Sequence, residues 1–261
     1  MAVKAPTRHP DVNDTAAALL AVAIAALGEG LVGYYLYGSL AWGGFDPATS
    51  DIDFVAVTRE ALTPGEFDTL ATAHAALASS GSRWSRDIEG YYLPLAQVRR
   101  YDPASPPVAR IERGADASFL YWTHQHWDGV IQRHQLRERG IVLHGPHPRD
   151  LIDPVSDGDL RRAAAAHVPE IRAWLEQEPD ALRHDGLHGY VVLTQCRILY
   201  TLALGEVASK PDAAAWAATN LPEPLAALAR KAARAAVGWE DRATTASLVE
   251  LTLTLAGALD G

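Results

Sequence analysis

The pattern of apolar residues changes once along this chain, and this change constrains the fold more than any other feature. Up to about residue 150, short apolar segments rich in β-branched and aromatic residues alternate with helical segments. From Ser156 onward, long alanine- and leucine-rich segments recur at helical spacing, with no convincing strand. The sequence therefore predicts an α+β chain, with an α/β domain over residues 1–150 and an all-α helical bundle over residues 156–261.

Individual elements follow from the same periodicity. In the first half we expect strands over 31–37, 52–57, 88–98 and 140–144, and helices over 11–28, 63–79 and 124–139. In the second half we expect five helices, over 157–178, 189–204, 212–219, 224–237 and 243–259. The proline-containing stretch 99–117 is expected to be irregular, as a lid or crossing loop, and 145–157 to be a linker.

Composition narrows the function classes. The chain has 261 residues and a formal net charge of −9, with no cluster of lysine and arginine, which argues against a nucleic-acid surface and suits a cationic small-molecule substrate. It has no apolar run long enough for a membrane span, and its first residues lack the apolar core of a signal peptide. We therefore expect a cytoplasmic protein without a membrane partner, and we expect it to be a monomer. The single cysteine, Cys196, is expected to be a buried small residue.

Two aspartates in the run YGSLAWGGFDPATSDIDFVAV carry the chemistry. Asp51 and Asp53 are two residues apart at the start of an apolar strand, so their carboxylates should emerge on one face. Two like charges at this spacing favour a cation between them, and hard oxygen ligands suit Mg²⁺ with phosphate oxygens as its other ligands. Gly38 and Ser39 form the preceding turn, where a backbone N–H group and a hydroxyl can bind a phosphate.

A third acid would complete such a site, either as a metal ligand or as the base that removes a proton from a substrate hydroxyl. Glu89, at the start of the expected strand 88–98, is the leading candidate because a neighbouring strand could place it opposite the aspartates. Asp87 shares its face by the period of two and remains the alternative.

Glycine-serine, a spacer, aspartate-x-aspartate and a later acid together resemble the nucleotidyltransferase superfamily of DNA-polymerase-β type. The segment Tyr190–Pro222, YVVLTQCRILYTLALGEVASKPDAAAWAATNLP, further resembles the C-terminal helical domain of the aminoglycoside (3'')(9) adenylyltransferases. This similarity extends through Leu143–Val155 and Gly238–Ala243, covers most of the chain and is weakest between Arg99 and Ala117. The resemblance implies a nucleotidyltransferase domain with a mixed sheet, followed by a helical domain that completes the ATP and substrate sites.

The resemblance also implies roles for particular residues. Asp51 and Asp53 would hold two Mg²⁺ ions, and Glu89 would act as a further metal ligand and general base. Gly38 and Ser39 would orient the phosphates of the co-substrate ATP. Arg197 and Lys210, from the helical domain, would bind the triphosphate, so ATP is expected to bind between the two domains.

Residues that contact the antibiotic follow the family pattern less closely. Trp174 and Asp180 match positions that the family places around the aminocyclitol. A family acid important for streptomycin falls on Leu187, where Asp185 is the nearest substitute. The family's streptomycin-linked tryptophan falls near Arg110 to Gly114, where this chain has none, although Trp122 and Trp127 follow. These departures favour spectinomycin over streptomycin.

The function expected from the sequence is transfer of AMP from MgATP to a hydroxyl of an aminoglycoside-type antibiotic, with release of pyrophosphate. One alternative is a nucleotidyltransferase of the same fold that acts on another acceptor, such as a metabolite or a protein. The other is a non-catalytic nucleotide-binding sensor.

Overall fold

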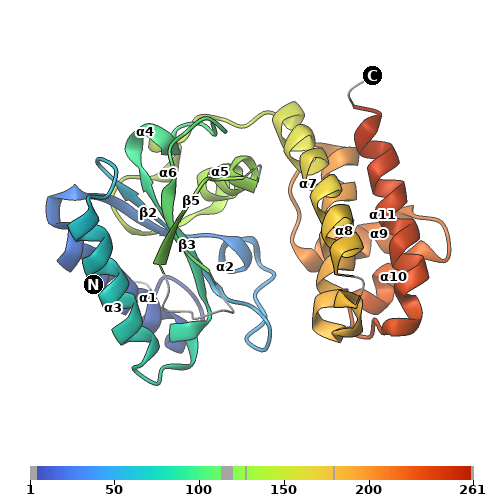
Figure 1. The fold of residues 1–261 in the computed structure, drawn as a ribbon, viewed down its shortest axis with the longest axis horizontal. Helices are drawn as coiled ribbons and strands as arrows, with labels where there is room; N and C mark the ends of the chain where they lie inside the picture. Colours follow the sequence, from blue (N-terminus) through green and yellow to red (C-terminus); the bar gives the residue numbers. More distant parts are fainter. Residues whose placement is uncertain (1–4, 113–119, 127, 179, 260–261) are drawn as a thin grey trace. The chain divides into compact units, whose positions relative to one another are not determined.

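The chain forms two compact units, Met1–Pro154 and Val155–Gly261. The computed structural model describes residues 5–112, 120–126, 128–178 and 180–259. The first unit contains a sheet with helices on it, and every regular element described in the second unit is a helix (Figure 1). The predicted α+β class, with an α/β part followed by a helical bundle, is confirmed.

In the described part of the first unit, six strands form a sheet in the order β5-β4-β3-β2-β1-β6. Strands β2 and β3 are parallel and the other neighbouring pairs are antiparallel, so the sheet is mixed. The register of the parallel pair places Asp53 directly beside Glu89. The strands are β1 (Leu31–Leu36), β2 (Ile52–Thr58), β3 (Ile88–Pro94), β4 (Val108–Ile111), β5 (Leu120–Thr123) and β6 (Ile141–His144).

Four predictions in the first unit are wrong in detail. The third strand ends at Pro94, and α4 (Leu95–Val98) follows it. Strand β4 lies inside the stretch predicted to be irregular, of which residues 113–117 fall outside the described part. The helix predicted from residue 124 is α5 (Asp128–Arg139), and α6 (Pro148–Leu151) lies in the predicted linker. Strands β4 and β5 have only four residues each, which is too few for a clear local sequence pattern. Pairing with neighbouring strands stabilises them.

Alternate residues of each central strand face opposite layers. Phe54 and Tyr92 belong to the core cluster that includes residues of α1 (Pro10–Leu27) and α3 (Pro64–Ala78), which lie together in Figure 1. Val55 and Tyr91 belong to the opposite cluster, with Leu136 of α5. This alternation places Asp53 and Glu89 on the α5 side of the sheet.

The helix α1 and the turn after it, Pro10–Gly30, are long and apolar enough to cross a membrane when length and composition alone are considered. A core helix of a soluble protein passes the same test. Val12, Ala16, Leu19 and Ala23 of α1 are fully buried in the core cluster on the sheet. We therefore interpret α1 as a core helix.

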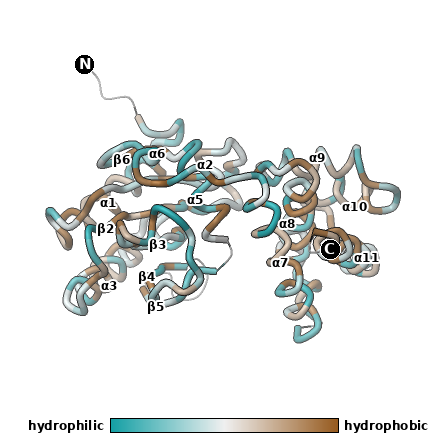
Figure 2. The backbone as a smooth tube through the Cα atoms, turned by 90° about the horizontal axis from the view of Figure 1, so that it is seen from above, coloured by the Kyte–Doolittle hydropathy of each residue, from teal (hydrophilic) through white to brown (hydrophobic). Residues whose placement is uncertain are grey.

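Among its described residues, the second unit has five longer helices, as predicted, with ends that differ from the expected ones by up to five residues. Two clusters of buried apolar residues hold them together, one around Val192, Cys196 and Leu248 and the other around Val168 and Ile198. Hydrophobic and hydrophilic segments alternate along their backbone (Figure 2). Cys196 is buried and unpaired, as expected. The helices are α7 (Asp157–Gln177), α8 (Asp185–Leu204), α9 (Lys210–Asn220), α10 (Leu225–Ala232) and α11 (Arg242–Gly257).

A buried histidine makes the stability of the first unit depend on pH. His74 of α3 is fully buried, and its Nε2 atom lies 2.8 Å from the Tyr92 hydroxyl. Burial lowers the pKa of His74 from 6.5 to about 4. Between these values only the unfolded chain takes up the proton, so this group's stabilisation is present above pH 6.5 and is lost as the pH falls. We expect His74 to lower the free energy of unfolding by about 3 kcal/mol over that interval.

Urea denaturation of the wild type and of His74→Gln at several pH values between neutral and weakly acidic would measure this contribution. Glutamine can keep a hydrogen bond to Tyr92 but does not titrate, so the variant should show a smaller loss of stability on acidification. The exposed His144 provides the matched control, because His144→Gln makes the same substitution on the surface of the same unit. Equal pH dependence in the wild type and in His74→Gln would contradict the role of His74.

Candidate active site

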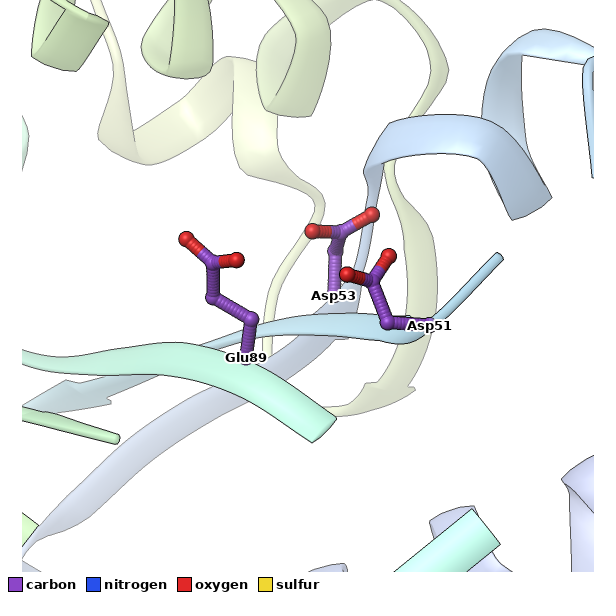
Figure 3. Close-up of side chains that lie close together, drawn as sticks. All are labelled: Asp51, Asp53 and Glu89. Atoms are coloured by element: carbon purple, nitrogen blue, oxygen red, sulfur yellow. The ribbon is translucent and has the colours of Figure 1, made fainter. Parts of the chain in front are cut away.

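Three carboxylates converge where β2 and β3 begin. Asp51 immediately precedes β2, Asp53 is its second residue, and Glu89 is the second residue of β3. One oxygen from each side chain lies within 4.8 Å of the others, and all three residues are partly buried (Figure 3). Among the described residues, this is the group of acids and histidines close enough to share a metal ion, and it does not include Asp87. The backbone oxygen of Asp87 instead accepts a hydrogen bond from the Ile52 amide.

The donor set of this cluster fits a hard divalent cation. Three carboxylates this close repel one another unless a cation lies between them. All the ligand atoms are oxygens, which Mg²⁺ prefers, and three protein ligands leave positions for water or phosphate oxygens. Asp51, Asp53 and Glu89 are therefore suited to hold Mg²⁺.

The turn after β1 packs directly against this cluster. Gly38 has φ +58°, and a Cβ atom added there would lie 1.8 Å from Asp53 Oδ2. Only glycine therefore fits between the turn and the carboxylate. Ser39 follows as the second residue of α2 (Gly38–Trp42), and its hydroxyl oxygen is buried with no hydrogen-bond partner among the described residues. Such a hydroxyl is available to donate to a ligand oxygen beside the acids.

Glu89 has a cationic neighbour on the adjacent strand β4. Arg110 of β4 donates from Nη2 to Glu89 Oε1 over 2.7 Å. Burial raises the pKa of the Glu89 carboxyl, the Arg110 charge opposes this shift, and the Asp51 charge adds to it. A raised pKa makes a carboxylate a better proton acceptor. Sequence reasoning did not identify Arg110, because its strand lies in the stretch predicted to be irregular.

The proposed triphosphate ligands lie in the helical unit. Arg197 is a partly buried residue of α8. Burial lowers the pKa of His167 to about 4, and the positive charge of Arg197 contributes to this shift. Lys210 is the exposed first residue of α9, and its Nζ atom lies 4.9 Å from the centre of the Tyr190 ring.

Comparison with known proteins identifies the relatives of the chain. Residues 150–256 match the family described as aminoglycoside adenylyltransferase, C-terminal domain. An aminoglycoside (3'')(9) adenylyltransferase of Klebsiella pneumoniae is 29% identical over 231 residues, which are 81% of this chain and 80% of that protein. A spectinomycin 9-adenylyltransferase of Staphylococcus aureus is 28% identical over 232 residues, or 79% of each protein. The resemblance to the aminoglycoside (3'')(9) adenylyltransferases is confirmed.

The fold of this chain is similar to that of a solved adenylyltransferase structure. It is the spectinomycin adenyltransferase AAD(9) from Enterococcus faecialis with ATP and spectinomycin, which matches with a TM-score of 0.69 at 20% identity. The match covers 95% of this chain and 99% of the other. Together, the similarities to adenylyltransferases confirm the prediction that the chain is a nucleotidyltransferase enzyme.

The residues matched to the adenylyltransferase drug site occupy different environments. Trp174 is half-buried and packs against the core cluster around Val168 and Ile198. Asp180 is 76% exposed and forms an ion pair of 2.5 Å with Arg183. Asp185 is the first residue of α8, and its side chain lies outside the described part of the structure.

Trp122 lies on the face of the sheet opposite the acids. It pairs with Ala109, a residue of the core cluster that contains α1 and α3, and it stacks on Phe67 of α3 at 5.0 Å between ring centres. Trp122 therefore points away from the acid cluster. Trp127 lies outside the described residues.

Proposed function

We propose that this protein transfers AMP from MgATP to a hydroxyl group of an aminoglycoside-type antibiotic and releases pyrophosphate. The observation that carries the proposal is the convergence of Asp51, Asp53 and Glu89 within 4.8 Å, beside a glycine-serine turn. The names of the relatives, and the solved neighbour with ATP and spectinomycin, support ATP as the donor and an aminoglycoside-type acceptor.

In the proposed reaction, a drug hydroxyl oxygen attacks the α-phosphorus of ATP. The bond from that phosphorus to the bridging oxygen breaks, pyrophosphate leaves, and Glu89 accepts the hydroxyl proton. Asp51, Asp53 and Glu89 would hold two Mg²⁺ ions, which when bound neutralise phosphate charge and lower the pKa of the attacking hydroxyl. The Ser39 hydroxyl and the Gly38 backbone orient the phosphates beside these acids.

Residues of the helical unit complete the proposed binding of both substrates. Arg197 and Lys210 bind the triphosphate, because a polyanion opposite three carboxylates requires cationic partners. Trp174, Asp180 and Asp185 bind the antibiotic, whose amino groups are cationic and therefore attract carboxylates. Spectinomycin is the preferred acceptor, since Leu187 replaces the acid that the family uses for streptomycin.

The proposed setting is the cytoplasm, with the protein acting as a monomer on small molecules. The net charge of −9 suits cationic acceptors and opposes binding to nucleic acid. The interpretation of α1 as a core helix supports the proposal that the protein has no membrane partner.

Release of pyrophosphate from MgATP, with spectinomycin and streptomycin assayed separately, tests this function. We expect release and a covalent AMP adduct with spectinomycin, with less or no product from streptomycin. Product from neither drug would contradict the proposal. In that case labelled ATP with a panel of metabolites and proteins would test for another acceptor, and labelling of none of them would favour a nucleotide sensor.

A further inference from the structure

A positively charged side chain contacts the proposed general base from the neighbouring strand. Arg110 of β4 donates to Glu89 Oε1 over 2.7 Å, and the two side chains are only 15% and 27% exposed. An ion pair shielded in this way is screened less by water and salt than a surface pair. Arg110 is therefore placed to determine the direction of the Glu89 carboxylate.

Other side chains hold Arg110 itself in place. Its guanidinium carbon lies 5.1 Å from the centre of the Tyr91 ring. Its Nη2 atom also lies 3.2 Å from Glu112 Oε1, and Glu112 accepts a hydrogen bond of 2.6 Å from the Tyr121 hydroxyl. Tyr121 lies opposite Arg110 in the pairing of β4 with β5. Residues of β3 and β5, together with Glu112 directly after β4, thus restrict the guanidinium on the face of the sheet that carries the acids.

Stability of the sheet alone does not explain this arrangement. The Nε atom of Arg110 is buried with no hydrogen-bond partner among the described residues, which costs free energy. A buried ion pair is also often no more stabilising than apolar residues of the same size. A charged residue kept at such a cost, in contact with a proposed metal ligand, points to a role in the site.

We propose that Arg110 is a positioning residue for adenylyl transfer, which holds one oxygen of Glu89 so that the carboxylate stays directed toward Asp51 and Asp53. This inference rests on the proposed function, because it assigns Arg110 to the same reaction. Arg110 does not contact the reacting atoms in this role and acts only through Glu89.

Kinetics of the variant Arg110→Ala test the positioning role. We expect kcat for pyrophosphate release to fall by about 10- to 100-fold, as for other residues that orient metal ligands, with little change in the KM for ATP. Arg110→Lys should recover part of the loss, and added guanidinium ion should partly rescue Arg110→Ala by occupying the vacated space. Arg149→Ala, which breaks the exposed ion pair with Glu138, is the matched control and should keep normal kcat.

A double-mutant cycle tests whether Arg110 acts through Glu89. This experiment requires no drug. Mn²⁺ would be titrated into the wild type, Arg110→Ala, Glu89→Ala and the double variant, each with a non-hydrolysable ATP analogue present. Because Glu112 already offsets much of the Arg110 charge, losing Arg110 should weaken Mn²⁺ binding by about 3- to 10-fold through misplacement of Glu89. In the Glu89→Ala background, where Arg110 has no carboxylate to hold, the same substitution should have no further effect.

The outcomes separate this inference from the proposed function. Unchanged kcat in Arg110→Ala, additive effects in the cycle, or tighter Mn²⁺ binding would each overturn the positioning role. A wild type that transfers no AMP to either drug, but whose Mn²⁺ cycle shows the coupling, would overturn the proposed function and leave the pairing of Arg110 with Glu89 supported. A wild type that binds no Mn²⁺ would overturn both.

Discussion

Replacing Glu89 by glutamine is expected to lower the turnover of adenylyl transfer by roughly 10²-fold or more while ATP binding is retained. Glutamine has nearly the shape of glutamate and its amide oxygen can still accept the hydrogen bond from Arg110, but it cannot take the proton of the attacking hydroxyl. Steady-state pyrophosphate release would give kcat, and an equilibrium titration with ATP would give the affinity. Near-normal turnover in Glu89→Gln would exclude the role of Glu89 as general base.

Asp87 offers a close control for this experiment. It lies two residues before Glu89 but outside the group of three acids, so Asp87→Asn should keep turnover within a few-fold of the wild type. A large loss in Asp87→Asn together with a small loss in Glu89→Gln would reverse the assignment of the two acids.

Replacing Asp53 by asparagine should lower the turnover of adenylyl transfer by about 10³-fold, a larger loss than in Glu89→Gln. The same substitution should not lower the stability of the protein. An asparagine carries no charge and is a weaker ligand for Mg²⁺, so the acids lose much of their affinity for the metal. Without metal, however, the three acids repel one another, so removal of one charge should leave the free energy of unfolding unchanged or raise it. Kinetics at increasing Mg²⁺ and urea denaturation in metal-free buffer would measure the two effects.

The exposed Asp68 of α3 provides the control for Asp53, since Asp68→Asn removes the same charge from the same unit at a distance from the site. It should change neither activity nor the dependence on Mg²⁺. If Asp53→Asn lost activity and stability together, the loss would reflect damage to the fold, and the metal-binding role of Asp53 would lose its support.

The elements that build the acid cluster could largely be predicted from the sequence. Strand β2 is a continuous apolar run, and Asp51 and Asp53 at its start follow the period of two. A local pattern cannot show that the strand containing Glu89 lies parallel and next to β2, so it cannot decide between Glu89 and Asp87. The family resemblance supports the choice of Glu89. The helices of the second unit could be predicted because alanine and leucine at helical spacing are a local signal.

The surroundings of Glu89 could not be predicted in the same way. Strand β4 follows two prolines and has only four residues. Its pairing with β3, about twenty residues earlier in the chain, stabilises it. Without β4 in the prediction, Arg110 had no assigned neighbour. The position of Trp122 is likewise not predictable, because the sequence does not show on which face of the sheet β5 presents it.

The pairing of β2 with β3 gives the hydrophobic core an influence on the chemistry. The register that places Asp53 beside Glu89 also brings Phe54 and Tyr92 together on the opposite face, with their ring centres 5.8 Å apart. A slip of one residue in β3 would exchange its two faces, turning Glu89 toward α1 and α3 and Tyr92 toward α5. The packing of these rings therefore also fixes the spacing of the acids, so a substitution in the hydrophobic core can alter the acid cluster without contacting it.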